Sequence, residues 1–231
     1  MGERTTITTP DGPFSAYVAR PKGASAPAVV VIQEIFGVNQ VMRDITDGLA
    51  GQGYLAICPD LFWRIEPGID ITDKSEAEWK RAFELFNAFD VDQGVKDIAA
   101  TIAAIRRDPG CNGKVGAVGF CLGGLLAFLT ATRTDADASA AYYGVGIENR
   151  VGEAEKLVKP LLMHIAEEDQ FVPKPAQAVI LQALKNHPNI EIHTYPGRNH
   201  AFARPGGEHY DEADAKLAGG RTLQFFKKHL G

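Results

Sequence analysis

The sequence has few cysteines, no long apolar run and no excess of basic residues. Its 231 residues include three cysteines, Cys58, Cys111 and Cys121. An odd number without close pairs argues against both a disulfide framework and a zinc knuckle. The formal net charge of -5 gives no basis for binding nucleic acid. No apolar run approaches the roughly 20 residues that a membrane span needs, so we expect neither a nucleic-acid nor a membrane partner.

The first residues also lack the apolar core of a signal peptide. Met1, Gly2 and Thr6 formally fit a myristoylation pattern, but the charged Glu3 and Arg4 follow the glycine, and we interpret the match as chance. These features predict a cytoplasmic protein whose cysteines are reduced.

What the chain does have is enough apolar content for a core, with 45% hydrophobic and 23% charged residues. It shows no repeat, no low-complexity tract and no long linker, which predicts one domain over residues 1–231. Continuous apolar runs alternate with helical patterns, as in a mostly parallel sheet covered on both faces. Residues 61–74 are the longest irregular stretch and are predicted to be a surface loop. The expected strands are 5–9, 14–18, 28–33, 54–58, 115–119, 140–143, 160–166 and 190–195, and the expected helices are 39–51, one after Ser75, 91–106, 122–130, 177–184 and 213–228.

Cys121 lies in the stretch GFCLG between an expected strand and an expected helix. Small residues two positions before and after it would relieve the crowding of a sharp strand-to-helix turn. The N-terminus of the next helix would favour a thiolate, and the Leu122 N–H could bind an oxyanion. The five-residue pattern alone is weak, because a buried structural cysteine is the commoner finding. Whether Cys121 is a nucleophile therefore depends on whether the sequence also offers an acid and a histidine to partner it.

Asp169 and His200 each follow an expected strand, in the chain order nucleophile, acid, histidine. His200 could take the thiol proton and Asp169 could fix its tautomer. Glu167 and Glu168 are alternative acids, but both are plausible solvated charges. The remaining histidines lie in expected strands or in polar surroundings, and His164 and His193 are interpreted as core or sheet-face residues.

With these three residues in place, the chain resembles the dienelactone hydrolase (carboxymethylenebutenolidase) family nearly from end to end. The resemblance implies an α/β-hydrolase fold without a large lid, a Cys121–His200–Asp169 triad, and no metal or cofactor. The stretches that carry it are QEIFGVN (33–39), GYLAICPDLF (53–62), FNAFD (86–90), GKVGAVGFCLGG (113–124), AYYGVG (141–146), EDQFVP (168–173) and NHAFAR (199–204).

The resemblance also assigns roles to Glu34 and Ile35. Glu34 would keep the resting thiol of Cys121 neutral until substrate binds, and Ile35 would supply a second oxyanion N–H beside that of Leu122. Taken alone, Glu34 could equally be a solvated residue at a strand end. A thiol held neutral would resist oxidation, which gives the arrangement a physical rationale.

Four further residues are expected to contact substrate. Arg204 matches a family arginine that binds the substrate carboxylate, a task that a forked guanidinium suits. Trp79 stands where the family has a second such arginine, and Phe83 where it has a tyrosine. Lys80 and Arg81 point about 100° and 200° away from Trp79 on a helix, and a shifted helix start could bring one of them to the position of the missing arginine. Tyr142 matches a position near the pocket. Each of these residues could also be ordinary packing or surface.

The sequence therefore predicts a monomeric ester hydrolase that opens a small carboxylate-bearing enol-lactone, such as dienelactone, by way of a thioester on Cys121. The missing arginine favours an alternative, a general small-ester or lactone hydrolase. A non-catalytic binding protein would not need the four residues Cys121, His200, Asp169 and Glu34. A thiol redox role is disfavoured because Cys121 has no CxxC partner.

Overall fold

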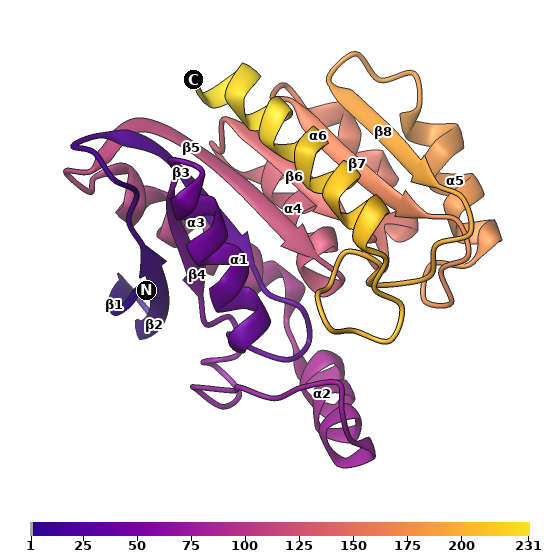
Figure 1. The fold of residues 1–231 in the computed structure, drawn as a ribbon, viewed down its shortest axis with the longest axis horizontal. Coiled ribbons are helices and arrows are strands. Elements are labelled where there is room, and N and C mark those ends of the chain that lie inside the picture. Colours follow the sequence, from indigo (N-terminus) through magenta and orange to yellow (C-terminus); the bar gives the residue numbers. More distant parts are fainter. Residues whose placement is uncertain (1) are drawn as a thin grey trace. The chain divides into compact units, whose positions relative to one another are not determined.

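The computed structural model describes residues 2–231 and contains an eight-stranded sheet in the order β1-β2-β4-β3-β5-β6-β7-β8 (Figure 1). The pairs β1–β2 and β2–β4 are antiparallel, whereas β3–β4, β6–β7 and β7–β8 are parallel. The mostly parallel sheet predicted from the alternating pattern is therefore confirmed. The strands are β1 (Glu3–Thr9), β2 (Gly12–Ala19), β3 (Ala26–Ile32), β4 (Leu55–Pro59), β5 (Cys111–Phe120), β6 (Ala138–Tyr142), β7 (Leu161–Ala166) and β8 (Ile190–Tyr195).

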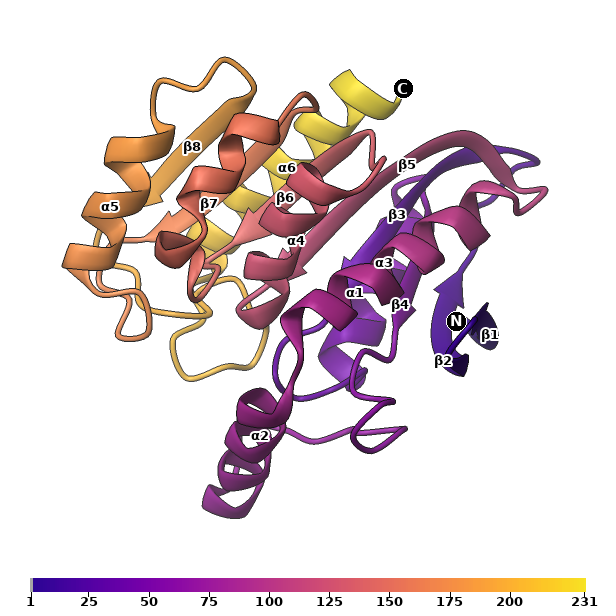
Figure 2. The ribbon, with the colours of Figure 1, turned by 180° about the vertical axis from the view of Figure 1, so that it is seen from behind.

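The chain divides into two compact units, Met1–Ala117 and Val118–Gly231, and β5 passes from the first into the second. In the first unit, α1 (Gln40–Gly51) and α3 (Val91–Arg106) pack on opposite faces of the strands (Figures 1 and 2). β3 and β4 are buried almost throughout, which explains their continuous apolar sequences. The expectation of a single domain over residues 1–231 stays a prediction.

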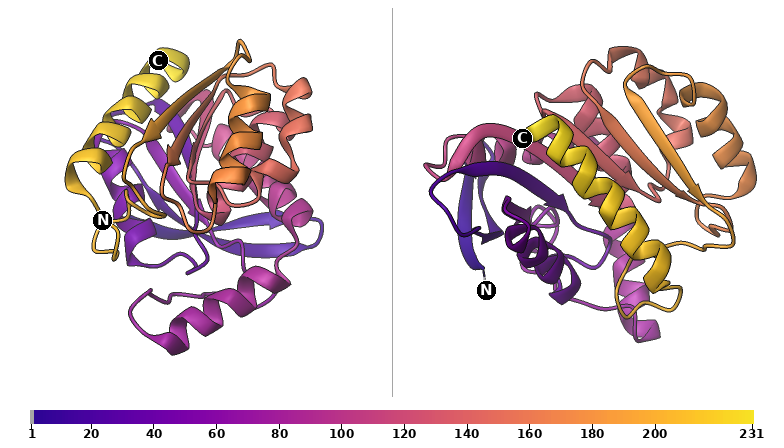
Figure 3. Two further views of the ribbon diagram at one scale, coloured as in Figure 1. Left: turned by 90° about the vertical axis from the view of Figure 1, so that its right-hand side faces the viewer. Right: turned by 45° about the horizontal axis from the view of Figure 1, so that its top comes forward.

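In the second unit, α4 (Leu122–Arg133) and α5 (Lys174–Leu184) cover one face of the strands and α6 (Glu212–Leu230) covers the other (Figures 2 and 3). Two short 3-10 helices, at Ile147–Asn149 and Val151–Lys156, were not predicted. Such pieces are too short to show a hydrophobic period. No helix within the described residues is both long enough and apolar enough to cross a bilayer.

The helix α2 (Glu76–Ala88) begins after Ser75 as predicted, and the Ser75 hydroxyl accepts the Glu78 N–H at 3.3 Å. Other boundaries differ by a few residues. β5 begins at Cys111 rather than at residue 115, and α5 begins at Lys174 rather than at residue 177. In both cases the polar end of the element carries no apolar period from which its start could be read.

Residues 61–73 are irregular, as predicted, but they are not a plain surface loop. Their backbone is hydrogen-bonded to the segment 33–39 that follows β3. The Leu61 N–H donates to Gln33 Oε1 at 3.0 Å and the Ile71 N–H to the Phe36 carbonyl at 3.2 Å. Asn39 Nδ2 donates to the Ile71 carbonyl at 2.9 Å. We call residues 61–73 the strap, because they bind both ends of this neighbouring segment.

Candidate active site

Cys121 lies in a strained turn between β5 and α4. Its φ of 57° and ψ of -117° are outside the regions that a side chain favours. The turn brings Gly119 against Gly123 so closely that a Cβ on Gly119 would lie 1.9 Å from the Gly123 carbonyl oxygen. The Cys121 N–H donates to the Tyr142 carbonyl at 3.1 Å, which ties the turn to β6. The structure thus contains the strand-turn-helix geometry that GFCLG predicts.

The thiol stands at the N-terminus of α4, where the partial positive charge of the helix favours an anion. Leu122 is the first residue of this 12-residue helix, so its N–H is among those that have no acceptor within the helix. Cys121 is 9% exposed. The position suits both a thiolate and a donor to a developing oxyanion.

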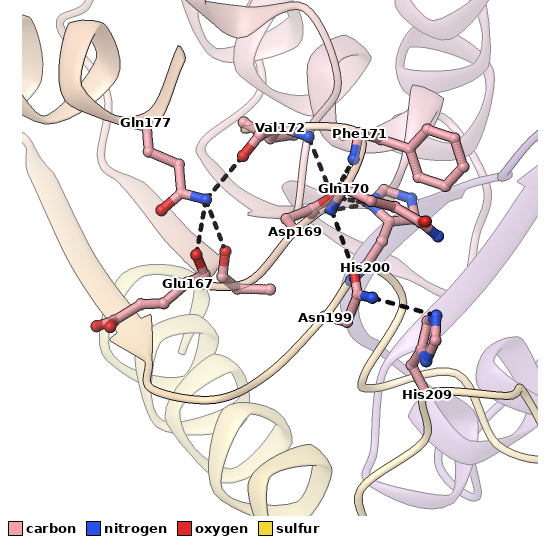
Figure 4. Close-up of polar contacts among 10 residues, drawn as sticks. Glu167, Asp169, Gln170, Phe171, Val172, Gln177, Asn199, His200 and His209 are labelled. Carbon is pink, nitrogen blue, oxygen red and sulfur yellow. Dashed lines mark hydrogen bonds and ion pairs between the residues drawn. The ribbon is translucent and has the colours of Figure 1, made fainter. Parts of the chain in front are cut away.

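His200 and Asp169 form a buried ion pair, as their chain order predicts (Figure 4). His200 Nδ1 lies 2.9 Å from Asp169 Oδ2 and 3.1 Å from Oδ1. Asp169 Oδ1 also accepts the Phe171 N–H at 2.8 Å and the Val172 N–H at 3.1 Å. These bonds orient the carboxylate and leave Nε2 as the imidazole atom available for proton transfer.

Two amide side chains hold the loops on which the pair stands. Asn199 Oδ1 accepts the His200 N–H at 2.7 Å and the Gln170 N–H at 3.1 Å, so it joins the two loops directly. Gln177 Nε2 reaches the carbonyls of Ala166, Glu167 and Val172 (Figure 4). Sequence reasoning missed both. The position of Asn199 next to His200 in the sequence was the only signal for it.

The environment of His200 favours its protonated form. Burial lowers the pKa of the imidazole, but the negative charge of Cys121, the hydrogen bonds to Asp169 and Cys121, and the charge of Asp169 raise it to about 10. The ring edges of Tyr143 and Phe171 flank the imidazole at 5.0 Å and 4.9 Å between centroids. These surroundings support a protonated imidazole at His200.

Glu34 and Ile35 follow β3 and are 2% and 5% exposed. The alternative that Glu34 is a solvated strand-end residue is therefore wrong. Gln33 Nε2 lies 3.4 Å from the Glu34 carbonyl, and Gln33 Oε1 accepts the Leu61 N–H at 3.0 Å. The Gln33 side chain therefore joins this turn to the strap. The roles of Glu34 and Ile35 in the reaction stay predictions.

Trp79 and Phe83 form an aromatic pair on α2, with stacked rings 5.6 Å apart. Trp79 also meets the Phe36 ring edge-on at 5.1 Å and donates its Nε1–H to the Asp73 carbonyl at 3.0 Å. Phe83 is 40% exposed, which leaves a hydrophobic ring surface at this position. The arrangement permits both packing and substrate contact.

The cationic neighbours of Trp79 do not offer a simple replacement for the missing arginine. Arg81 is paired with Glu66 at 2.5 Å and with Glu84 at 3.0 Å. Lys80 is exposed. Arg204 is half-buried in a turn whose Arg204 N–H donates to the Ala201 carbonyl at 2.9 Å. Its carboxylate-binding role stays a prediction.

Tyr142 is 3% exposed, and its hydroxyl lies 2.6 Å from Thr222 Oγ1. Its ring packs against Phe120 and His164, at 4.7 and 4.2 Å between centroids. Burial raises the pKa of this phenol, against the effect of the hydrogen bond to Thr222. These contacts favour the structural role that the sequence left open for Tyr142 over direct contact with substrate.

Comparison with known proteins settles the family. A profile of the dienelactone hydrolase family matches residues 14–230. The chain belongs to the dienelactone hydrolase family. A candidate carboxymethylenebutenolidase of Azospirillum brasilense is 55% identical over 98% of this chain and 100% of its own, and the carboxymethylenebutenolidase of Pseudomonas putida is 41% identical over 97% and 96%. A crystal structure of a candidate dienelactone hydrolase from Klebsiella pneumoniae superposes with a TM-score of 0.86 at 30% identity, covering 98% of each chain.

Membership of the dienelactone hydrolase family confirms the predicted relationship, the α/β-hydrolase fold and the class of enzyme, a hydrolase of carboxylic ester bonds. The structure places Cys121, Asp169 and His200 in one unit of the chain and pairs His200 with Asp169, and the roles of the three residues in the reaction stay predictions. The mechanism and the substrate go beyond what family membership shows.

Proposed function

We propose that this chain hydrolyses a small enol-lactone that carries a carboxylate, through a thioester on Cys121. The reaction is of the same type as the hydrolysis of dienelactone to maleylacetate. The single observation that carries the proposal is the strained Cys121 turn in the same unit of the chain as the buried His200–Asp169 pair. The relative from Pseudomonas putida, named carboxymethylenebutenolidase, supports the substrate class.

In the first half-reaction, the Cys121 thiolate attacks the lactone carbonyl carbon and forms a C–S bond. The negative charge moves to the carbonyl oxygen, where the Leu122 N–H donates to it, together with that of Ile35 as the resemblance implies. When the tetrahedral intermediate collapses, the ring C–O bond breaks. The His200 imidazolium gives its Nε2 proton to the leaving enol oxygen, and the thioester remains.

In the second half-reaction, neutral His200 takes a proton from water, and the resulting hydroxide attacks the thioester carbonyl. The C–S bond breaks and the Cys121 thiolate leaves beside a protonated His200. Asp169 accepts the hydrogen bond from His200 Nδ1–H throughout the cycle. This bond stabilises the imidazolium each time it forms. The cycle needs no redox change and restores the starting charges.

Glu34 is proposed to hold the resting thiol neutral until substrate arrives. A protonated thiol reacts slowly with an alkylating agent, whereas a thiolate reacts fast. Iodoacetamide alkylation distinguishes the two states. Gated activation predicts faster alkylation of Cys121 with a substrate analogue than without it, whereas equal rates would contradict the gate.

The alternative proposal is a general small-ester or lactone hydrolase without a strong carboxylate preference. It is favoured by the aromatic pair of Trp79 and Phe83 and by the ion pairs that occupy Arg81. Under the main proposal, Arg204 binds the substrate carboxylate. Under the alternative, the rings contact an uncharged part of the ester.

Hydrolysis of dienelactone and of p-nitrophenyl acetate by the same preparation tests both proposals. The main proposal predicts that Arg204→Ala raises the KM for dienelactone by about tenfold or more, as expected for one lost charge-assisted contact, and leaves the neutral ester unaffected. Cys121→Ala should abolish both activities. Activity on the neutral ester alone, unchanged by Arg204→Ala, would favour the general esterase, and activity on neither ester in folded protein would overturn both. The monomeric state stays a prediction that light scattering can check.

A further inference from the structure

A chain of five polar side chains lies in the unit Val118–Gly231, apart from the residues to which the reaction above assigns a step. Four of them are buried and the fifth, Arg221, is half-buried. His164 on β7 is at its centre and is 1% exposed. Its Nδ1 lies 2.7 Å from the Tyr195 hydroxyl and its Nε2 lies 3.0 Å from Thr222 Oγ1. Thr222 Oγ1 also lies 2.6 Å from the Tyr142 hydroxyl oxygen, and Arg221 donates to the Tyr195 hydroxyl oxygen at 3.1 Å. We call these five residues the His164 network.

The His164 network has one obligatory donor, the guanidinium of Arg221. A guanidinium can only donate, so the Tyr195 oxygen accepts from Arg221. We therefore assign the Tyr195 hydroxyl proton to the bond with His164 Nδ1 and the imidazole proton to Nε2, which then donates to Thr222. Burial, the nearby His193 and Arg221 all lower the pKa of His164 well below its ordinary value, in keeping with this neutral tautomer.

The main-chain atoms of the same residues hold the three catalytic segments. The Tyr142 carbonyl accepts the Cys121 N–H at 3.1 Å. The Tyr195 carbonyl accepts the Glu167 N–H at 3.1 Å, at the start of the loop that carries Asp169. It also accepts the Arg198 N–H at 3.3 Å, in the loop that carries His200.

The ring of Tyr195 adds a second connection to the histidine loop, because it packs on Phe202 at 4.6 Å between centroids. The Tyr143 N–H donates to the His164 carbonyl at 2.8 Å, and the Tyr143 ring meets the His200 ring. One hydrogen-bonded chain therefore links the side chains of Tyr142, His164 and Tyr195, while their backbones support the nucleophile, the acid loop and the base.

We propose that the His164 network is a positioning device that holds Cys121, Asp169 and His200 in register across β6, β7, β8 and α6. The proposal rests on the proposed function, since it assigns these residues to support the same catalytic group. Its physical basis is that catalytic contacts tolerate little displacement, and that a fully satisfied buried polar network is more directional than apolar packing. Its members are positioning residues and none of them touches substrate.

The sharpest test compares Thr222→Val with Thr222→Ser. Valine has nearly the same shape but removes the hydroxyl that joins His164 to Tyr142, whereas serine keeps it. Thr101→Val is the matched control, because Thr101 is likewise a buried threonine in a helix. Its hydroxyl donates to the Asp97 carbonyl at 2.8 Å, outside the His164 network. kcat, KM, the Cys121 alkylation rate and Tm are measured for each variant.

We expect Thr222→Val to lower kcat by about fivefold to twentyfold, the effect of a misplaced catalytic contact, with KM within about twofold. Alkylation of Cys121 by iodoacetamide should slow as well. Thr222→Ser should restore both rates, and Thr101→Val should lower Tm but change neither rate.

A purely structural role would give Thr222→Val the same kcat and alkylation rate as wild type despite a lower Tm, and this result would overturn the proposal. If Thr222→Val does not fold, Tyr195→Phe removes a hydroxyl at the other side of His164 and carries the same expectation and the same contrary outcome. Alkylation needs no ester substrate. Failure of the wild type to hydrolyse esters would therefore overturn the proposed function, while the alkylation comparison would still decide on the network.

Discussion

At the scale of single residues, His200 is placed between the carboxylate of Asp169 and the thiol of Cys121. Both partners favour the imidazolium, although burial of the ring opposes it. Asp169 contacts the ring at Nδ1. The charge state of the base therefore depends on the nucleophile as much as on the acid.

Cys121→Ala should lower the pKa of His200, because the substitution removes both the charge and the hydrogen bond of the thiol while burial of the ring remains. The expected change is from about 10 in the wild type to a value lower by at least about one unit, as is typical for loss of an adjacent charge. The titration of the His200 ring protons by NMR measures it. An unchanged titration would show that Asp169 alone sets the charge of the base.

Gly119→Ala should be strongly destabilising, by about 3 kcal/mol or more, in the range of overpacking combined with backbone strain. The new Cβ would lie 1.9 Å from the Gly123 carbonyl oxygen, which belongs to the backbone and cannot turn aside. Gly152→Ala is the control, because no atom lies within 4 Å of its ideal Cβ and its φ is not positive. Urea denaturation of both variants checks the difference, and equal stability would contradict the close approach in the turn.

At the scale of elements, the strap joins two segments of the first unit that carry predicted functional residues. It precedes α2 with Trp79, and it is bonded to the segment with Glu34 and Ile35. Asn39 has two separable tasks there. Its Oδ1 accepts the Met42 N–H at 3.2 Å and begins α1, while its Nδ2 donates to the Ile71 carbonyl of the strap.

Asn39→Asp should loosen the strap without loosening α1. The carboxylate keeps an oxygen for the Met42 N–H but places another against the Ile71 carbonyl, where a donor is lost. Amide hydrogen exchange of residues 69–73 should become about fivefold to tenfold faster, as expected for one hydrogen bond of about 1 kcal/mol. Asn39→Ala should also expose the first turn of α1. Protection of the strap equal to wild type in Asn39→Asp would contradict the bond to Ile71.

Elements and site residues were predictable to different degrees, for physical reasons. Apolar runs and caps marked the strands, and Ser75 marked the start of α2, because burial and capping leave local patterns. The ordered residues Cys121, Asp169 and His200 were found because strand ends converge at one edge of a parallel sheet. The strap and the His164 network left no such pattern. They are made of contacts between residues far apart in the sequence, and each partner alone looks like an ordinary loop or core residue.

At the scale of the whole molecule, two buried histidines act on stability in opposite pH ranges. His164 has a folded-state pKa below 6.5, so its contribution is complete above pH 6.5 and is lost as the pH falls. His200 has a folded-state pKa of about 10, so its contribution is complete below pH 6.5 and is lost as the pH rises toward 10. Together they favour greatest stability near pH 6.5.

The free energy of unfolding should therefore fall on both sides of about pH 6.5. Each histidine can contribute at most about 1.4 kcal/mol per pH unit within its range. Urea denaturation between pH 5 and 9 measures the profile. His164→Gln should flatten the acid side and His200→Gln the alkaline side. Parallel profiles for wild type and both variants would show that other groups control the pH dependence.

The bonds around Asp169 have a consequence for the tautomer of the base. Asp169 Oδ1 is held by two backbone N–H donors, of Phe171 and Val172, and Oδ2 is the closer oxygen to His200. In Asp169→Asn, the amide oxygen must take the place of Oδ1, where it accepts the two backbone N–H groups. The NH2 group of the asparagine then faces His200 Nδ1. The neutral imidazole would then carry its proton on Nε2, which is the atom that has to accept a proton in the proposed reaction. The substitution would thus keep the shape of the site and reverse the polarity of its base, which ring nitrogen chemical shifts would reveal directly.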